Sequence, residues 1–408
     1  MNNKNMKILH TSDWHLGQNF KNRSREQEHE KFLAWLIETI ESKKIDILIV
    51  AGDIFDTANP PKYALTMYHD FLVKVIKTAC SDVIIVAGNH DSVATLEVTK
   101  NFAKSLNIHI VATGEDIDET IVSIKKDDQL KAIVCAVPYL RDNIIRDANK
   151  SKNNKELENE YKEGMKQYYK NIYNKAKDIS SNVPIIATGH FTTTGATVNP
   201  DSEREIYIGK LSDVDSEVLT SFDYVAMGHL HKSQQVGKHN HIRYSGSPIP
   251  LSFSEYNQTK SVIVVEFKDK NIENIEIIDI PLFKGIYRIT GTIQEIKDEL
   301  ENINDKENKP FLDVVATNET LLDVDLKEFL NNTYDDGVDI ISIQKEKKIE
   351  DRVLTDVEQD TKLEELDYLS VFEKRLEAED SLVDNSDLKN KLINEYKVIV
   401  QELENEDK

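Results

Sequence analysis

The first ninety residues alternate short apolar runs with longer segments in which apolar residues recur every three or four positions. Met6 to His10 (MKILH), Asp46 to Ala51 (DILIVA) and Val83 to Ala87 (VIIVA) are the short runs, and each predicts a buried strand. Glu26 to Lys43 and Pro61 to Ala79 have the spacing of helices with one buried face, and the second begins with proline. Strands alternating with amphipathic helices predict an α/β fold, a layered core in which helices cover a sheet.

The pattern changes twice further along the chain. Ser151 to Ser180 is rich in charged residues but carries Tyr161, Met165, Tyr168 and Ile172 at helical spacing, which predicts an exposed helix packed on the domain surface. From Ser233 to Pro281 strands and turns prevail. Further strands are predicted at Lys131 to Val137, Val183 to Thr188 and Tyr224 to Met227.

A domain boundary is predicted near Pro281. Residues 1–281 would form the α/β domain, residues 282–348 a small α+β domain, and residues 349–408 a C-terminal helical segment. Within the last two parts, strands are predicted at 287–291, 310–316 and 338–344, and helices at 293–303, 326–331, 363–376 and 388–403.

Charge and composition narrow the class of protein. The formal net charge of -22 argues mildly against a protein that coats nucleic acid by itself, but it does not exclude a nucleic-acid enzyme. No apolar stretch is long enough to span a bilayer, and the polar start of the chain has no signal-peptide core, so we expect a cytoplasmic protein. Cys80 and Cys135 are the only cysteines and predict buried free thiols rather than a zinc site.

Polar clusters follow most of the predicted strands. In open α/β sheets, ligands bind beyond the carboxyl ends of the strands, so these clusters are expected to converge. A glycine directly precedes several of them, which allows a tight turn and a close backbone approach. The candidate residues are Asp13 and His15; Asp53 and Asp56; Asn89, His90 and Asp91; His190; and His229 and His231.

These donors indicate a metal site. Imidazoles, two carboxylates and one amide oxygen are too many for a single tetrahedral zinc, and the mixed set suits manganese, iron or magnesium. Two ions about 3.5–4 Å apart, bridged by one carboxylate, would clamp a phosphate and activate a water for in-line attack. His90 could protonate the leaving oxygen or stabilise charge on the phosphate, with Asp56 orienting its ring.

Each cluster alone has a simpler explanation. A single GH or GNHD segment is more often a turn than a ligand site, so the prediction rests on the joint occurrence and order of the clusters. Three other histidines are assigned no role in the site. His10 is interpreted as a core or supporting residue, and His29 and His69 as structural or exposed positions on helices.

The ordered set D-x-H, G-D, G-N-H-D, G-H, G-H-x-H resembles the calcineurin-like metallophosphoesterases. More narrowly, the chain resembles the SbcD family, the nuclease subunits of bacterial SbcC–SbcD complexes and relatives of the Mre-type double-strand-break nucleases. The likeness rests on the segments TSDWHLG, AGDIFDTANPP, AGNHDS, VPYLR, MGHLH and YSGSPIPLSFSE, and is strong from Met6 to about Glu255. The segment GDIFDTA lacks the arginine found in protein serine/threonine phosphatases, which argues against that branch.

The resemblance implies specific roles for the candidate residues. His90 would be the catalytic histidine, paired with Asp56. Two Mn²⁺ ions, with Mg²⁺ as another option, would be held by two ligand sets that share Asp53 as a bridge. The first set is Asp13, His15, Asp53 and His231, and the second is Asp53, Asn89, His190 and His229.

The resemblance also implies a function and partners. The expected activity is a manganese-dependent DNA nuclease, acting on double-strand ends as an exonuclease and on single strands or hairpins as an endonuclease, in DNA end processing, recombination and repair. Residues 282–348 would be the family's capping domain, and residues 349–408 would dock on an SbcC-like coiled-coil ATPase. That partner would bind the ATP, in agreement with the lack of a G-x-x-x-x-G-K-[ST] motif in this sequence. A homodimer within a heterotetramer is expected.

Two other functions remain open from the sequence. One is a phosphodiesterase or nucleotidase for small substrates, which would need neither a cap nor a helical docking segment. The other is a non-catalytic scaffold that recruits an ATPase. The presence of every proposed ligand and of His90 argues against the scaffold.

Overall fold

The computed structural model of the chain describes residues 5–145, 154–197, 214–303, 308–317 and 338–345. By its contacts, the chain up to Glu346 forms one compact unit. The helices predicted at 326–331, 363–376 and 388–403 lie outside the described residues.

Two six-stranded sheets form the centre of this unit. In the first, the strand order is β14-β13-β1-β4-β5-β6, in which β1, β4, β5 and β6 run parallel and β13 and β14 are antiparallel additions at one edge. Its strands are β1 (Met6–Thr11), β4 (Ile47–Ala51), β5 (Asp82–Val86), β6 (Ile108–Val111), β13 (Ser261–Lys268) and β14 (Asn271–Asp279). A separate short ribbon pairs β2 (Asn19–Phe20) with β3 (Arg23–Ser24).

The second sheet has the order β11-β12-β10-β9-β8-β7. Its four central strands are parallel, and the two edge strands β7 and β11 are antiparallel. The strands are β7 (Ile121–Lys126), β8 (Gln129–Cys135), β9 (Ile185–His190), β10 (Tyr224–Gly228), β11 (Gln234–Val236) and β12 (His239–Tyr244).

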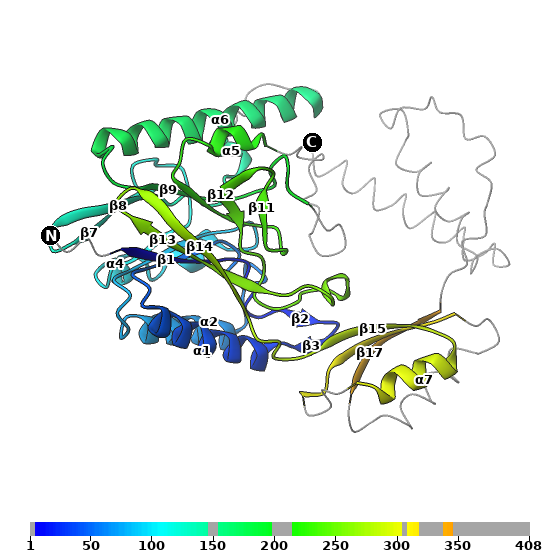
Figure 1. Cartoon of the computed structure of the whole chain (residues 1–408). Coiled ribbons are helices and arrows are strands. Elements are labelled where there is room, and N and C mark those ends of the chain that lie inside the picture. The colour runs from blue at the N-terminus through cyan, green and yellow to red at the C-terminus, as the bar shows by residue number, and fades with distance from the viewer. Residues whose placement is uncertain (1–4, 146–153, 198–213, 304–307, 318–337, 346–408) are drawn as a thin grey trace, which may run out of the picture. The chain divides into compact units, whose positions relative to one another are not determined.

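Helices cover the outer faces of both sheets (Figure 1). Apolar residues of α1 (Glu26–Lys43) and α2 (Lys62–Val75) share a core with the first sheet, and those of α6 (Asn154–Ile179) share one with the second. A third core lies between the sheets, where fully buried side chains such as Ile49 and Val134 belong to one cluster. This arrangement confirms the predicted α/β class, a sandwich of two sheets flanked by helices. The remaining helices of this part are α3 (Val93–Glu97), α4 (Lys100–Lys104), α5 (Asp142–Ile145), η1 (Ser216–Leu219) and η2 (Phe253–Glu255).

The structure differs from the predicted elements in a few places. The helix predicted for Pro61 to Ala79 ends at Val75, because the next backbone hydrogen bonds close tighter three-residue turns, from Lys77 N to Lys74 O and from Thr78 N to Val75 O. In α6 the fully buried tyrosine is Tyr169, whereas the predicted Tyr168 is only half-buried.

After Pro281 the chain forms a small parallel sheet with one described helix. β15 (Ile286–Gly291), β16 (Phe311–Ala316) and β17 (Asp339–Lys345) pair in sequence order, and α7 (Ile293–Glu301) packs on them. Thr292 and Glu295 cap the helix reciprocally at its N-terminus. The division of the chain into three domains stays a prediction. Among the described residues, no helix is long and apolar enough to cross a membrane.

Candidate metal centre

The carboxyl ends of five strands meet at one edge of the sandwich. Asp13 follows β1, Asp53 follows β4, Asn89 follows β5, and His190 is the last residue of β9. In the second sheet Gly228, the last residue of β10, lies opposite His190 in the register, so His229 and His231 leave that sheet at the same level. The convergence expected from the polar clusters is therefore present in the fold.

The backbone is strained at four of the candidate ligands. Asp13, His15, Asp53 and His229 have φ angles of 53°, 47°, 50° and 93°, in the left-handed region that non-glycine residues rarely adopt. This conformation costs roughly 1–2 kcal/mol per residue and persists only where surrounding contacts enforce it. The sharp turns direct carboxylates and imidazoles from separate loops into one space.

Glycine is required beside these ligands because the chains approach so closely. Gly52 has φ +93°, and a Cβ atom there would lie 2.2 Å from Nδ1 of His190. A Cβ atom on Gly88 would lie 2.1 Å from Oδ1 of Asp53. Both distances are far below contact distance, which confirms the close approach that the sequence predicted.

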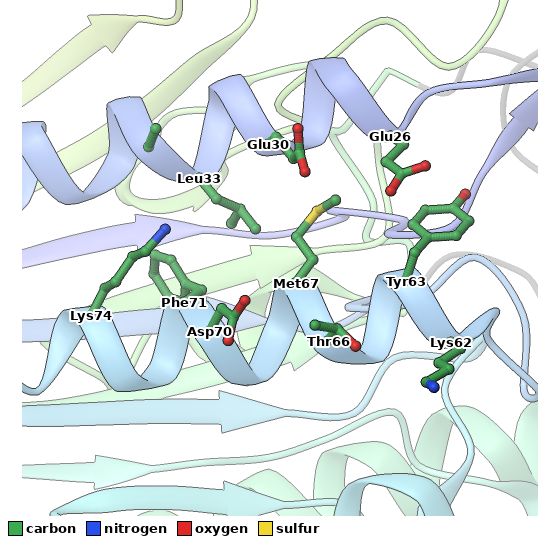
Figure 2. Close-up of a pocket in the computed structure, with 11 residues that line it drawn as sticks. Glu26, Glu30, Leu33, Lys62, Tyr63, Thr66, Met67, Asp70, Phe71 and Lys74 are labelled. Atoms are coloured by element: carbon green, nitrogen blue, oxygen red, sulfur yellow. The ribbon is translucent and has the colours of Figure 1, made fainter.

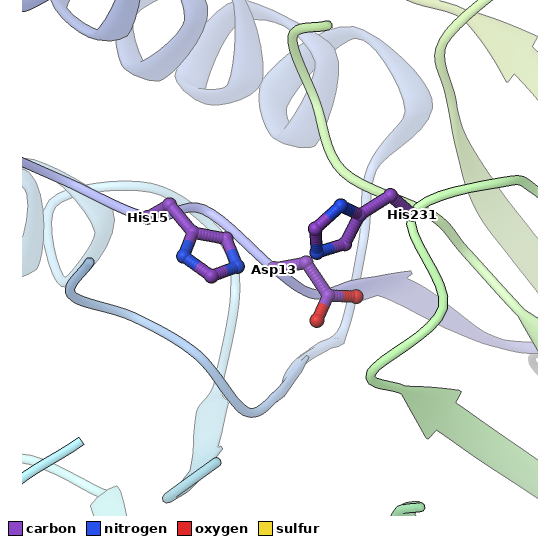
Figure 3. Close-up of side chains that lie close together, drawn as sticks. All are labelled: Asp13, His15 and His231. Atoms are coloured by element: carbon purple, nitrogen blue, oxygen red, sulfur yellow. The ribbon is translucent and has the colours of Figure 1, made fainter. Parts of the chain in front are cut away.

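The first group of ligand candidates, here the Asp13 cluster, comprises Asp13, His15 and His231 (Figure 3). The three are buried, and one donor atom from each lies within 4.8 Å of the others. Nε2 of His15 lies 3.6 Å from Oδ2 of Asp53, and Nδ1 of His15 lies 3.3 Å from Oδ1 of Asp56, but neither contact has the geometry of a directed hydrogen bond. Among the described residues neither ring nitrogen of His15 has a hydrogen bond, and the carboxylates that face both nitrogens make it a candidate metal ligand.

The second group, here the Asp53 cluster, comprises Asp53, Asn89, His190 and His229. Nε2 of His190 lies 3.1 Å from Oδ2 of Asp53 and 3.1 Å from Oδ1 of Asn89, and Nδ1 of His229 lies 3.1 Å from the same amide oxygen. Nδ1 of His190 donates to the carbonyl of Ala51 at 2.9 Å, which fixes the tautomer and leaves Nε2 as the ligand atom. Asp13, Asp53 and His190 also form a candidate group of their own, so the two clusters adjoin.

The electrostatics of the two clusters favour a cation. Burial alone would lower the pKa of His190, but the carboxylate of Asp53 outweighs it and raises the pKa to about 9. Desolvation and the neighbouring His190 lower the pKa of His229 to about 3. Burial would raise the pKa of the Asp53 carboxyl, yet His190 holds it below its usual range. The carboxylates thus draw a proton onto an imidazole, and a divalent cation satisfies the same negative charge.

His90 lies at the edge of this space but is oriented differently from the expectation. Its ring packs edge-on against His15, with centroids 4.8 Å apart. Its Nδ1 lies 2.8 Å from the main-chain carbonyl oxygen of Asp56, whereas the Asp56 carboxylate lies 3.3 Å from the ring of His15. The expected partner is therefore present, but the hydrogen bond that orients His90 comes from the backbone of Asp56.

A second layer of residues supports the ligands, and the sequence identified little of it. Asp91 accepts hydrogen bonds from the main-chain N–H groups of Ile54, Phe55 and Gly88, and so ties the loop of Asp53 to the loop of Asn89. Desolvation, together with the nearby Asp53, raises the pKa of Asp91 to about 6. The sequence suggested only that Asp91 was a supporting or turn residue.

Glu255 and Lys260 were not recognised as parts of the site. Both are buried, and burial alone would raise the pKa of Glu255, but the ammonium of Lys260 lowers it to about 2. The available signal was the segment YSGSPIPLSFSE, which ends in this glutamate but matches no ligand spacing. Residues that support a ligand have no characteristic spacing in the sequence, because the tertiary path of their loop brings them to the site.

A groove between α1 and α2 is separate from these residues. It has a volume of about 610 Å³ and lies between Leu33 on one helix and Met67 and Phe71 on the other, with carboxylates such as Glu30 and Asp70 along it (Figure 2). None of the candidate metal ligands lines it. The groove is therefore not part of the candidate metal centre.

The layered fold and the mixed oxygen and imidazole donors at its strand ends define the class of metal-dependent phosphoesterases. Comparison with known families agrees: the calcineurin-like phosphoesterase family matches residues 6–233, and the family described as type 5 capsule protein repressor C-terminal domain matches residues 282–380.

Known relatives narrow the class. The SbcD subunit of nuclease SbcCD from Escherichia coli (strain K12) is 38% identical over 381 residues, which cover 92% of this chain and 94% of that protein. The SbcD subunits from Rhodobacter capsulatus and Bacillus subtilis (strain 168) are each 32% identical, and each match covers 64% of this chain and 66% of the relative. The chain therefore belongs to the calcineurin-like phosphoesterases and, within them, to the SbcD family of nuclease SbcCD subunits. It is a metal-dependent phosphodiester hydrolase.

Proposed function

We propose that the chain is the manganese-dependent nuclease subunit of a DNA end-processing complex, with exonuclease activity on double-strand ends and endonuclease activity on single strands and hairpins. The observation that carries the proposal is the convergence of the Asp13 cluster and the Asp53 cluster at one edge of the sandwich, beside His90. The relatives named as nucleases support the choice of nucleic acid as substrate.

Each metal ion has its own ligand set in this proposal. Asp13, His15 and His231 would hold one ion, Asn89, His190 and His229 would hold the other, and Asp53 would contribute to both sets. The proximity of Nε2 of His15 and Nε2 of His190 to the same oxygen, Oδ2 of Asp53, supports a shared role for Asp53 in both sets. Imidazole ligands in this number favour manganese over magnesium, which prefers oxygen. When bound, the two ions supply the Lewis acidity that activates a water and neutralises charge on the phosphate.

His90 moves the proton. The carbonyl of Asp56 can only accept, so Nδ1 of His90 carries the hydrogen of that bond and Nε2 is the atom that exchanges a proton with the substrate. Desolvation lowers the pKa of His90, which keeps the free enzyme's ring mostly neutral at pH 7. The charge of a bound phosphate opposes this shift and favours the protonated ring that the leaving oxygen needs.

Cleavage of an end-labelled DNA hairpin with Mn²⁺ tests the activity. The parent chain is compared with Asp53→Ala, which removes the bridging carboxylate, and with Asp82→Asn, a buried carboxyl at the opposite end of β5. Cutting by the parent and by Asp82→Asn, but not by Asp53→Ala, is the expected result. If the parent hydrolyses only a small phosphodiester and no DNA, alone or with its ATPase, the small-substrate function replaces the nuclease.

We place the docking of an SbcC-like coiled-coil ATPase in residues 349–408, which would build the complex that the relatives' name describes. The sequence there carries Leu363, Leu366, Leu369 and Leu376 at helical spacing. A chain truncated after Lys348 is expected to keep its metal binding and lose co-purification with the ATPase. Full retention of the ATPase by the truncated chain would show that the docking site lies outside residues 349–408.

A homodimer is the final part of the proposal. Val98 and Phe102, four residues apart at the end of α3 and in α4, are 83% and 72% exposed. An exposed apolar pair of this size favours an interface. Phe102→Glu is expected to yield a monomer by light scattering, whereas Ile277→Glu, at a similarly apolar but separate position on β14, leaves the dimer intact. A parent chain that is already monomeric would contradict the proposal.

A further inference from the structure

A buried ion pair lies directly behind the ligand His231. Glu255 is the last residue of η2, and Lys260 directly precedes β13. The ammonium of Lys260 is 2.5 Å from Oε2 of Glu255, and the two side chains are 5% and 0% exposed. A buried pair of this kind contributes little net stability compared with an apolar pair, so its presence calls for another explanation.

The pair contacts His231 at two separate points. Lys260 donates through Nζ to the main-chain carbonyl of His231 at 3.0 Å. Oε1 of Glu255 lies 3.5 Å from Nδ1 of the His231 ring. One partner therefore fixes the backbone of the ligand, and the other faces its ring.

Ser247 completes the enclosure of the same carbonyl. Its main-chain N–H donates to His231 O at 3.1 Å, and its hydroxyl accepts from Lys260 Nζ at 3.0 Å. Glu255 also accepts from the main-chain N–H of Leu251 at 3.2 Å, which closes the loop on itself. The ammonium and the carboxylate thus connect the loop of residues 247–260 to one histidine.

We infer that the Glu255–Lys260 pair positions His231, and so sets the affinity of the ion held by the Asp13 cluster. Nδ1 of His231 faces Oε1 of Glu255 at 3.5 Å, without the geometry of a directed hydrogen bond, so the carboxylate acts on the ring through its charge and Nε2 is the ring nitrogen left for the metal. The inference rests on the proposed ligand set and adds two positioning residues to it. Neither residue belongs to the proposed ligand set.

Because Glu255 and Lys260 carry opposite charges, removing one charge and removing both are expected to change the metal affinity differently. In the parent chain the negative charge of Glu255 offsets the positive charge of Lys260, so that Lys260 repels a nearby metal cation only weakly. Glu255→Gln removes the balance and leaves an unpaired ammonium close to the Asp13 cluster, so this variant combines a misdirected ring with repulsion of the ion. The double variant Glu255→Gln/Lys260→Met removes both charges and leaves only the loss of orientation.

Titration of the metal-free full chain with Mn²⁺ by calorimetry tests the inference, with circular dichroism as the check on folding. The parent is expected to bind two ions. Glu255→Gln is expected to bind one of them about 10–100-fold more weakly and the other with unchanged affinity. The double variant is expected to recover part of that loss, and it keeps the test informative if the single variant does not fold. Asp82→Asn, a buried carboxyl that contacts His109 instead of a ligand, is the control and is expected to bind both ions as the parent does.

The outcomes separate the inference from the proposed function. Two ions bound by the parent, and bound equally well by Glu255→Gln or by the folded double variant, overturn the positioning role and leave the ligand set intact. Failure of the parent itself to bind two ions overturns the ligand set, and the inference with it. A loss of affinity in Asp82→Asn equal to that in Glu255→Gln also overturns the inference, because it shows a general effect of buried carboxyls.

Discussion

The Asp53 cluster and the Asp13 cluster lie side by side, but their histidines His190 and His231 face different groups, a main-chain carbonyl in one case and a side-chain carboxylate in the other. In the Asp53 cluster His190 donates to the carbonyl of Ala51, and Asp53 accepts from the main-chain N–H of His90. In the Asp13 cluster the ring of His231 faces the side chain of Glu255, and Asp13 accepts from the hydroxyl of Ser12 as well as from a main-chain N–H.

This difference indicates which substitutions would disrupt each cluster. Main-chain support is set by the path of the strands and the small size of the neighbouring glycines, so most substitutions nearby leave it unchanged, but an added Cβ atom destroys it. Side-chain support can be removed one group at a time, with graded effects. Four predictions, ordered by the size of the expected effect, test this contrast.

His90→Asn separates catalysis from both clusters and is expected to have the largest effect. Cleavage of labelled DNA is expected to fall by about 10²–10⁴-fold, because the proposed proton donor is lost, while calorimetry still finds two Mn²⁺ ions. Loss of an ion from this variant would show that His90 is a ligand and belongs to one of the clusters.

Gly52→Ala breaks the support of the Asp53 cluster. The new Cβ atom meets the ring of His190 at 2.2 Å and also forces alanine into a left-handed conformation, which costs about 1–2 kcal/mol. The expected result is loss of the ion in the Asp53 cluster, measured as a change in stoichiometry from two to one. Gly237→Ala is the matched control, since Gly237 also has positive φ but no atom of the described residues lies within 4 Å of its added Cβ. Equal metal loss in both would assign the effect to backbone strain alone.

Asp91→Asn weakens the tie between the loops of the Asp53 cluster. The amide replaces one accepting oxygen with a donor that faces a main-chain N–H, at a cost of about 1–3 kcal/mol in the free energy of unfolding. Urea denaturation measures this change. Asp128→Asn, in an exposed turn, serves as the control and is expected to change stability by no more than about 0.5 kcal/mol. Equal stability of the Asp91 variant and the parent would show that the hydrogen bonds to Asp91 do not stabilise the fold.

Ser245→Ala tests the side-chain support of the Asp13 cluster and is expected to have the smallest effect. Its hydroxyl lies 2.7 Å from Ser12, which in turn donates to Asp13. One lost hydrogen bond costs about 0.5–1.5 kcal/mol, so the affinity for one ion falls by no more than about tenfold. Ser261→Ala removes a buried hydroxyl that has no hydrogen-bond partner among the described residues and is expected to leave both affinities unchanged. A full loss of the ion in Ser245→Ala would mean that the Asp13 cluster tolerates no change in its support.

Long amphipathic helices and uninterrupted apolar strands were predictable, whereas short helices and a strand interrupted by a polar residue were not. The helix from Glu26 to Lys43 begins and ends where the spacing of its apolar residues predicted. The helices Val93–Glu97 and Lys100–Lys104 and the strand Ile108–Val111 were missed, since a segment of four or five residues is too short to show a period.

The amino-acid sequence by itself determined the class of the fold and the set of candidate ligands. Both are local: a strand is encoded by its own apolar run, and a candidate ligand in a loop by its position just after that run, as for Asp53 after β4. Only the tertiary structure decided that the carbonyl of Asp56 orients His90 and that Glu255 and Lys260 lie behind His231. These contacts join residues separated by up to 34 positions, and their partners are chosen by the path of the folded chain, which no local pattern of residues encodes.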